Sequence, residues 1–187
     1  MAGSYVSLPG DLPRPEDDGA ANHLTGMKLP SLALPSTAGG TVDFSGLTGT
    51  TVIYAYPMTG RPGTPLPEGW DEIPGARGCT PQSCAFRDHY AELKGLGVEN
   101  LFGLSVQDTE YQSEAADRLH LPFPLLSDGK GELQTALALP VMEVEGMRLL
   151  KRLPMILRGG KIAKVFYPVF PPDRNAGDVI AWLAANR

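Results

Sequence analysis

Two cysteines stand five residues apart in the segment GCTPQSC of residues 78–84, where a helix is predicted to begin. The unpaired N–H groups in the first turn of a helix, together with the helix dipole, favour an anion. A thiol held at such a place becomes the thiolate more readily, and the thiolate is the nucleophilic form. Cys79 precedes Thr80, the predicted N-cap, whereas Cys84 lies in the second turn. Cys79 is therefore the better candidate nucleophile.

The spacing of the two cysteines predicts a switch between two states. In an ideal helix the Cα atoms of residues five apart are separated by about 8.7 Å, whereas a disulfide requires less than about 7 Å. The intact helix thus keeps Cys79 and Cys84 from bonding. If Cys79 is oxidised to a sulfenic acid and the first turns unwind, Cys84 can reach it and expel water. Thr80, Pro81 and Ser83 are mediocre helix formers, which makes that unwinding easier.

Other interpretations of the cysteine pair are open at this point. The helical spacing and the absence of a recognisable secretion signal disfavour a permanent structural disulfide. A zinc pair is disfavoured because His23, His89 and His120 fall at no ligand-like spacing to the cysteines. Two inert buried cysteines remain an alternative.

The elements around the pair are those that could position a nucleophile. Residues 50–56 (TTVIYAY) form a continuous β-branched and aromatic run, typical of a strand buried on both faces. Residues 57–78 are rich in proline and glycine, and a structureless stretch of that length tends to be functional or mobile. A helix follows, with Thr80 as its cap, Pro81 in its first turn and a core stripe at Phe86, Tyr90 and Leu93.

The rest of the chain alternates strands with helices, which predicts an α/β fold with a mixed sheet and helices on both faces. A hairpin is expected from residues 29–34 and 41–44, and a second one from residues 152–157 and 161–167. Further strands are expected at residues 98–105 and 124–128. Helices are expected at residues 109–120, opened by a Thr109–Gln112 capping box, at residues 132–137, and at residues 176–184, capped by Asn175.

Length, composition and charge narrow the class of protein. The 187 residues suffice for one well-buried domain, expected at 26–187, preceded by a flexible or loosely docked arm at 1–25. The net charge of -5 argues against nucleic acid or an anionic membrane as a partner. The N-terminal segment is polar and acidic, unlike a signal peptide, so a cytoplasmic location is expected.

The cysteine helix resembles that of the Q-type peroxiredoxins, also called the bacterioferritin-comigratory-protein group. The likeness covers about 150 residues, from Gly26 to the last helix. The cysteine segment with Phe86-Arg87-Asp88 is its specific part; weaker agreement comes from the Leu29-Pro30 segment, the Gly39-Gly40 turn, the Tyr54-Ala55-Tyr56-Pro57 segment and the Leu126-Ser127-Asp128 segment.

The resemblance implies a thioredoxin-like fold and a peroxidase that reduces hydrogen peroxide and organic hydroperoxides without a cofactor or metal. Cys79 would be the peroxidatic cysteine and Cys84 the resolving one, with thioredoxin or a similar dithiol as reductant. Arg152, before a strand and a glycine turn, matches the family arginine that stabilises the thiolate and polarises the peroxide. Tyr56, Pro57 and Phe86 are expected to wall the thiol pocket. The assembly is expected to be a monomer or a homodimer.

The chain departs from the family pattern just before Cys79. The family carries a threonine or serine three residues before the peroxidatic cysteine, and here that residue is Ala76. About 15 extra residues, 64–78, interrupt the loop, so the hydroxyl that should hold the peroxide has no assigned position. Thr59 is the first candidate, with Thr64, Thr80 or a backbone group of the insertion as alternatives. The insertion, which contains Trp70, is interpreted as a lid, a dimer contact or a plain surface excursion.

Two rival functions are kept. A thiol-disulfide oxidoreductase or redox relay would share the fold, although a C-x-x-C pair is absent from the sequence. A non-catalytic thioredoxin-like binding module would use the insertion as its working surface. Arg87 and Asp88 are interpreted as surface or ion-pair residues, and His89 as a helix residue without a catalytic role.

Overall fold

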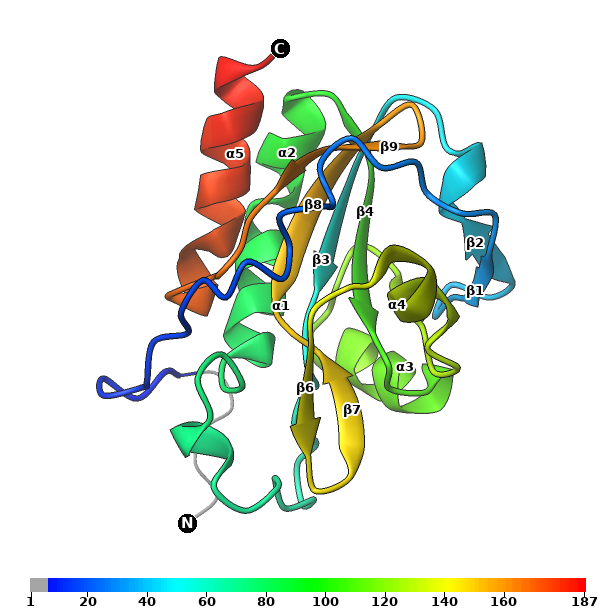
Figure 1. The fold of residues 1–187 in the computed structure, drawn as a ribbon. Coiled ribbons are helices and arrows are strands. Elements are labelled where there is room, and N and C mark those ends of the chain that lie inside the picture. Colours follow the sequence, from blue (N-terminus) through cyan, green and yellow to red (C-terminus); the bar gives the residue numbers. More distant parts are fainter. Residues whose placement is uncertain (1–6) are drawn as a thin grey trace.

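The computed structural model describes residues 7–187 and is built on a five-stranded mixed sheet (Figure 1). Its strand order is β5-β4-β3-β8-β9. Strands β3, β4 and β5 run parallel, and β8 and β9 add antiparallel strands at the other edge. The strands are β3 (Thr50–Ala55), β4 (Val98–Ser105), β5 (Leu125–Ser127), β8 (Leu153–Arg158) and β9 (Lys161–Val165).

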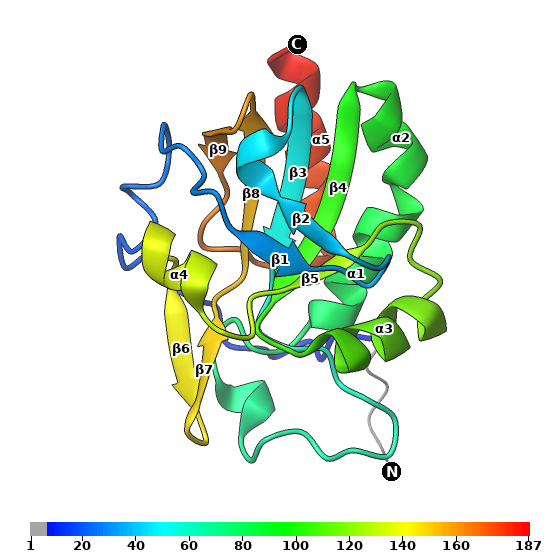
Figure 2. The same cartoon turned by 90° about the vertical axis from the view of Figure 1, so that its right-hand side faces the viewer.

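Helices cover both faces of this sheet, as the alternation of predicted elements indicated (Figures 1 and 2). On one face lie α1 (Cys79–Asp88), α2 (Tyr90–Gly95) and α5 (Asn175–Ala185). On the same face α3 (Thr109–Arg118) packs through Ala116 against the core that contains Phe86 of α1. On the other face lie α4 (Glu132–Leu137) and the hairpin of β1 (Ala33–Pro35) and β2 (Thr41–Asp43). Short 3-10 helices occur at η1 (Phe44–Gly46), η2 (Trp70–Glu72) and η3 (Pro172–Arg174).

Strand β3 separates two hydrophobic cores, because successive side chains of a strand point to opposite faces. Val52 and Tyr54 belong to the core under α1 and α5, and Ile53 and Ala55 belong to the core under the β1–β2 hairpin and α4. All four are at most 1% exposed. The predicted strand buried on both faces is confirmed, and its end delivers the chain to the loop before Cys79.

The predicted helix caps were wrong at three places. Helix α1 begins at Cys79 itself, with Gly78 as N-cap at φ 110, so Thr80 is already inside the first turn. The side chain of Asp108, not Thr109, caps α3 by accepting from Tyr111 N. Arg174 is the N-cap of α5, and Asn175 is its first residue, whose side chain accepts from Gln82. A cap depends on the backbone conformation before the helix, which residue type alone does not specify.

Two further differences concern element boundaries. The single helix predicted through Leu93 is divided at His89 into α1 and α2. A hairpin of β6 (Val141–Val144) and β7 (Met147–Leu150) occupies a region where no strand was predicted. Its two-residue turn, Glu145 and Gly146, has positive φ at both positions (49 and 77), the conformation of the tight turns that connect such strands.

The predicted insertion, residues 64–78 of the 57–78 loop, packs against this unexpected hairpin. Trp70, in η2, is 4% exposed and shares a small hydrophobic cluster with Val144 and Leu149 of the hairpin strands. The backbone N–H of Glu68 also donates to Glu145 in the hairpin turn at 3.1 Å. The β6–β7 hairpin and the insertion therefore support each other below the sheet in Figure 1.

The predicted N-terminal arm is docked along the part that the structure describes; its residues 1–6 lie outside the described residues. Leu24 is fully buried and Ala21 is 7% exposed, and both belong to the core that contains β1 and α4. Residues 20–25 thus pack with the domain, although the pattern analysis placed the domain boundary after them. Among the described residues, no helix combines the length and hydropathy needed to cross a membrane.

Candidate active site

Cys79 is the first residue of α1 and is 3% exposed. It follows Gly78, whose φ of 110 is a conformation that other residues rarely adopt. A Cβ at position 78 would also lie 2.3 Å from Pro172 Cγ. Glycine is therefore required at the entry to α1, and this entry brings the sulfur to the N-terminal end of the helix, as the sequence predicted.

Arg152 faces the same sulfur from the other end of the sequence. It directly precedes β8, is 3% exposed, and its Nη2 lies 3.4 Å from Cys79 Sγ. The same nitrogen lies 3.2 Å from the carbonyl oxygen of Ala76 and 3.1 Å from that of Arg77. The guanidinium thus joins the loop before α1 to the cysteine, and the structure brings two of the predicted site residues together.

Gln82 completes this arrangement, and the sequence analysis missed it. Its Oε1 accepts from Arg152 Nη1 at 2.5 Å, and its Nε2 donates to Asn175 Oδ1 at 2.7 Å. Gln82 is fully buried, three residues after Cys79 on the same helix. A polar residue one helical turn from Cys79 was the available signal. Its partners, Arg152 before β8 and Asn175 of α5, are brought together only by the fold.

The charge of Arg152 is notable because it is buried without a carboxylate. Within residues 7–187 its hydrogen-bond partners are the Gln82 amide, backbone carbonyls and the Cys79 sulfur. A buried charge is costly unless it is paired. Arg152 therefore holds N–H donors directly beside the Cys79 sulfur, where they can also reach an oxygen bound next to it.

Cys84 has a different environment. Both cysteines are free, and Cys84 is partly exposed where Cys79 is buried. Partial burial raises the pKa of the Cys84 thiol, against the opposing effect of the nearby Arg87 guanidinium. While α1 is folded, Cys84 is thus held as the neutral thiol.

An aromatic cluster supports the helix beneath the cysteines. The rings of Tyr54 and Phe86 stack with centroids 4.5 Å apart, and Tyr56 stacks on Tyr54 at 5.7 Å. The Tyr54 hydroxyl donates to Ser83 at 3.0 Å. Tyr56 and Phe86 belong to the same hydrophobic core as Cys79. Pro57, the third residue predicted to wall the pocket, is also buried.

A small cavity lies directly beside Cys79. Residues from the loop, the insertion and the first turn of α1 line it: Met58, Gly60, Leu66, Trp70, Arg77, Gly78, Cys79 and Thr80. Thr59 is not in this lining; it is 1% exposed and its hydroxyl donates to Gln107 Oε1 at 3.3 Å. Of the hydroxyls considered from the sequence, only that of Thr80 belongs to a residue lining the cavity. The insertion contributes Leu66, Trp70 and Arg77 to the wall around the thiol.

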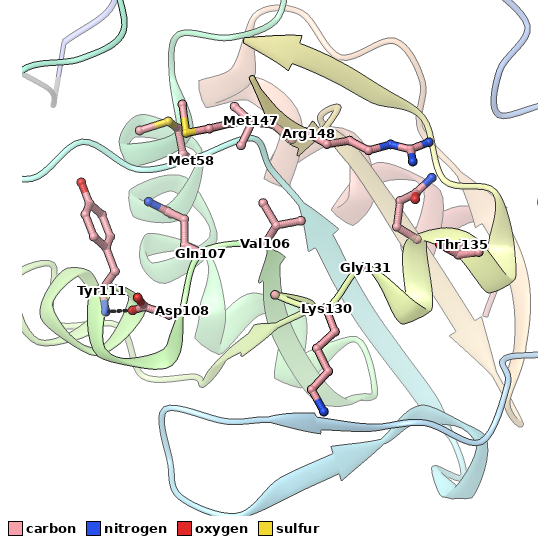
Figure 3. A pocket seen from close by; sticks show the side chains of 13 residues that line it. Met58, Val106, Gln107, Asp108, Tyr111, Lys130, Gly131, Thr135, Met147 and Arg148 are labelled. Carbon is pink, nitrogen blue, oxygen red and sulfur yellow. Dashed lines mark hydrogen bonds between the residues drawn. The ribbon is translucent and has the colours of Figure 1, made fainter. Parts of the chain in front are cut away.

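A larger groove of about 580 Å³ opens beside α3, and neither cysteine lines it (Figure 3). Met58 and Met147 approach each other at one end, and Asp108 caps α3 through the N–H of Tyr111. Met58 lines both this groove and the cavity at Cys79, so its side chain stands between them.

A redoxin family model matches residues 24–180, which include every residue of the site described above. The chain belongs to the redoxin family. Within this family its relatives are of the Q type, and the predicted membership of the Q-type peroxiredoxins is confirmed.

Two curated relatives illustrate the likeness. The chain is 28% identical over 159 residues to the chloroplastic peroxiredoxin Q of Oryza sativa subsp. japonica, covering 84% of this chain and 65% of the relative. It is 27% identical over 184 residues to that of Gentiana triflora, covering 95% of this chain and 77% of the relative. The chain thus spans about two thirds of the length of the first of these relatives.

The solved structures agree on the fold. The peroxidoxin BcpB of Mycobacterium tuberculosis superposes with a TM-score of 0.70 at 24% identity, covering 88% of this chain and 99% of that one. This confirms the predicted thioredoxin-like peroxiredoxin fold.

Proposed function

We propose that this redoxin is a thiol-dependent peroxidase in which Cys79 is the peroxidatic cysteine and Cys84 the resolving cysteine. The observation that carries the proposal is the 3.4 Å contact between Arg152 Nη2 and Cys79 Sγ at the start of α1. A buried guanidinium without a carboxylate favours the thiolate beside it and offers donors to an oxygen that gains negative charge. Relatives named peroxiredoxin support the same activity.

In the first step the Cys79 thiolate attacks one oxygen of the peroxide. The S–O bond forms as the O–O bond breaks, and the leaving oxygen departs as an alkoxide or hydroxide that takes up a proton. Arg152 donates to the oxygens during this transfer, while Gln82 holds its other nitrogen in place. The products are an alcohol or water and the sulfenic acid of Cys79.

In the second step the Cys84 sulfur attacks the sulfenic sulfur, the S–S bond forms, and water leaves. Both residues belong to α1, whose ideal geometry separates their Cα atoms by about 8.7 Å, more than a disulfide allows. The first turns of α1 must therefore unwind for the disulfide to close. An external dithiol, thioredoxin or one like it, then reopens the disulfide by exchange.

Two threonines are candidates for the hydroxyl that holds the peroxide. Thr59 was the first candidate from the sequence, but its hydroxyl donates to Gln107. Thr80 lines the cavity next to Cys79. The variants Thr59→Val and Thr80→Val test the two candidates. Loss of the hydroxyl that contacts the peroxide should raise the KM for peroxide, and loss of the other should not.

Mass measurement of the reduced protein after peroxide treatment tests the proposal. Wild type should lose two hydrogens, Cys84→Ser should gain one stable oxygen, and Cys79→Ser should not change. Wild type that gains oxygen without losing hydrogens would remove Cys84 from its role. A wild type with both thiols still titratable after one equivalent of peroxide would contradict the peroxidase assignment itself.

The reductant, the assembly and the location each have a test of their own. We propose thioredoxin or a similar dithiol as the reductant. Measuring peroxide consumption with and without a thioredoxin system tests this. The choice between a monomer and a homodimer is tested by sedimentation. A cytoplasmic location is tested by fractionation of the source cells; the rice and gentian relatives are named as chloroplastic proteins.

A further inference from the structure

The N-terminal arm is anchored to the rigid part of the domain at residue 18. The Asp18 carboxylate lies 2.8 Å from Lys151 Nζ and accepts from the Tyr167 hydroxyl at 2.7 Å. These hydrogen bonds, that of Lys151 first, hold the pKa of Asp18 well below its ordinary value. Beyond the anchor, Ala21 and Leu24 are buried in the main core. Lys151 itself directly precedes Arg152, so the anchor lies next to the guanidinium in sequence, just before β8.

The other end of the arm rests on the segment just before Cys79. A Cβ built on Gly78 would lie 3.0 Å from Leu8 Cδ2, and one built on Gly75 would lie 3.6 Å from Pro15 Cβ. Leu12 lines a small cavity together with Arg77 and Arg152. The arm therefore covers residues 75–78, the chain that leads into the nucleophile.

These same residues border the turn that has to move during disulfide formation. Gly78 is the N-cap of α1, and its carbonyl accepts the first helical hydrogen bond, from Gln82 N at 3.0 Å. When that turn unwinds, the contacts of Leu8 and Pro15 with Gly78 and Gly75 cannot all persist. Contacts present in only one of two states stabilise that state.

We infer that residues 8–18 act as a strap that holds residues 75–78 in the folded, reduced arrangement and slows closure of the Cys79–Cys84 disulfide. The kinetic part of this inference rests on the proposed peroxidase cycle. The strap lengthens the life of the sulfenic acid and so sets how readily a second peroxide oxidises it further to the sulfinic acid.

The strap is tested first on the reduced full-length protein without any peroxide. Amide hydrogen exchange is compared among wild type, Leu8→Ser and Asp18→Asn. Losing an exposed ion pair or a comparable contact should speed exchange of the Gln82 amide by up to about fivefold, because local opening of α1 becomes easier. Amides in the middle of α5 should be unchanged.

A matched variant controls for the loss of a surface carboxylate. Asp43→Asn removes a carboxylate that accepts hydrogen bonds from Ser31 and Ser45 in the β1–β2 region. It should leave exchange of the Gln82 amide at the wild-type rate. Equal exchange of that amide in wild type and both arm variants would overturn the strap.

The effect of the strap on the rate of disulfide formation is measured by stopped-flow fluorescence. Mass analysis of quenched samples identifies the sulfenic, sulfinic and disulfide forms. The disulfide-forming phase should accelerate up to about fivefold in Leu8→Ser and Asp18→Asn, matching their change in amide exchange. In these variants a higher peroxide concentration should then be needed to oxidise Cys79 to the sulfinic acid. A faster opening of α1 with no faster disulfide formation would overturn the inferred slowing. If wild type does not react with peroxide, the proposed function fails, while the exchange measurements still decide whether the strap exists.

Discussion

The guanidinium of Arg152 and the sulfur of Cys79 lie 3.4 Å apart, although 73 residues separate them along the chain. The contact joins the N-terminal end of α1 to the residue before β8, which pairs with β3 in the centre of the sheet. The sheet is therefore the element that sets the distance between cation and thiol. Predictions about the reaction follow from this distance and from the groups that maintain it.

Replacing Arg152 by lysine should lower kcat/KM for peroxide by about a hundredfold or more, because one ammonium cannot reproduce the paired donors of the guanidinium. Single-turnover kinetics of Cys79 oxidation measures this. Arg158→Lys is the control, since Arg158 is exposed at the end of the same strand and its guanidinium lies over Trp182. If kcat/KM fell by a similar factor in both variants, the loss in Arg152→Lys would not come from its contact with the Cys79 thiol.

Replacing Gln82 by alanine should slow Cys79 oxidation by about tenfold, because Arg152 loses the acceptor that fixes its Nη1. The free energy of unfolding should also fall by about 1–3 kcal/mol, since buried partners lose their hydrogen bonds. Gln112→Ala is the control: Gln112 is equally buried and donates to Ser105 and Leu126. It should lose stability but not reactivity, as measured by urea unfolding and stopped-flow kinetics.

The pH dependence of disulfide formation should report whether α1 opens before Cys84 reacts. Burial raises the pKa of Cys84 in the folded helix, which holds the thiol neutral over a wider pH range. Once the turn unwinds, Cys84 meets water and ionises with an ordinary pKa of about 8.5. The rate of the second step should therefore rise with pH and level off above that ordinary value. A midpoint at distinctly higher pH would indicate attack from the folded helix.

Replacing Trp70 by alanine should open the wall around Cys79 and weaken the insertion. Trp70 packs with Val144 and Leu149 and lines the cavity beside the thiol. We expect a loss of about 3 kcal/mol in the free energy of unfolding and faster alkylation of Cys79 by a bulky maleimide. Trp182→Ala on α5 is the control for a lost tryptophan. It should not speed the alkylation, which is followed by mass spectrometry.

The sequence analysis correctly predicted the parts of the fold that depend on local pattern. The run at residues 50–56 is a central strand because β-branched and aromatic side chains occupy both of its faces. The helix caps were less predictable: Gly78 serves where Thr80 was expected, since a positive φ was needed at that position. The β6–β7 hairpin was missed because each strand spans only four residues and the Glu145-Gly146 turn lacks the Asn-Gly or Asp-Gly signal of such hairpins, although its strands pack with Trp70.

The sequence by itself placed both cysteines on one helix with Cys79 at its start, because the pair and the helix start lie within seven consecutive residues. The environment of that pair was decided by tertiary structure. Arg152, Gln82 and Asn175 come from three separate elements and meet only when β8 and α5 pack around α1. Short-range patterns specify backbone conformation and reactivity, whereas the partners of a buried charge depend on which distant segments the fold brings within hydrogen-bonding distance.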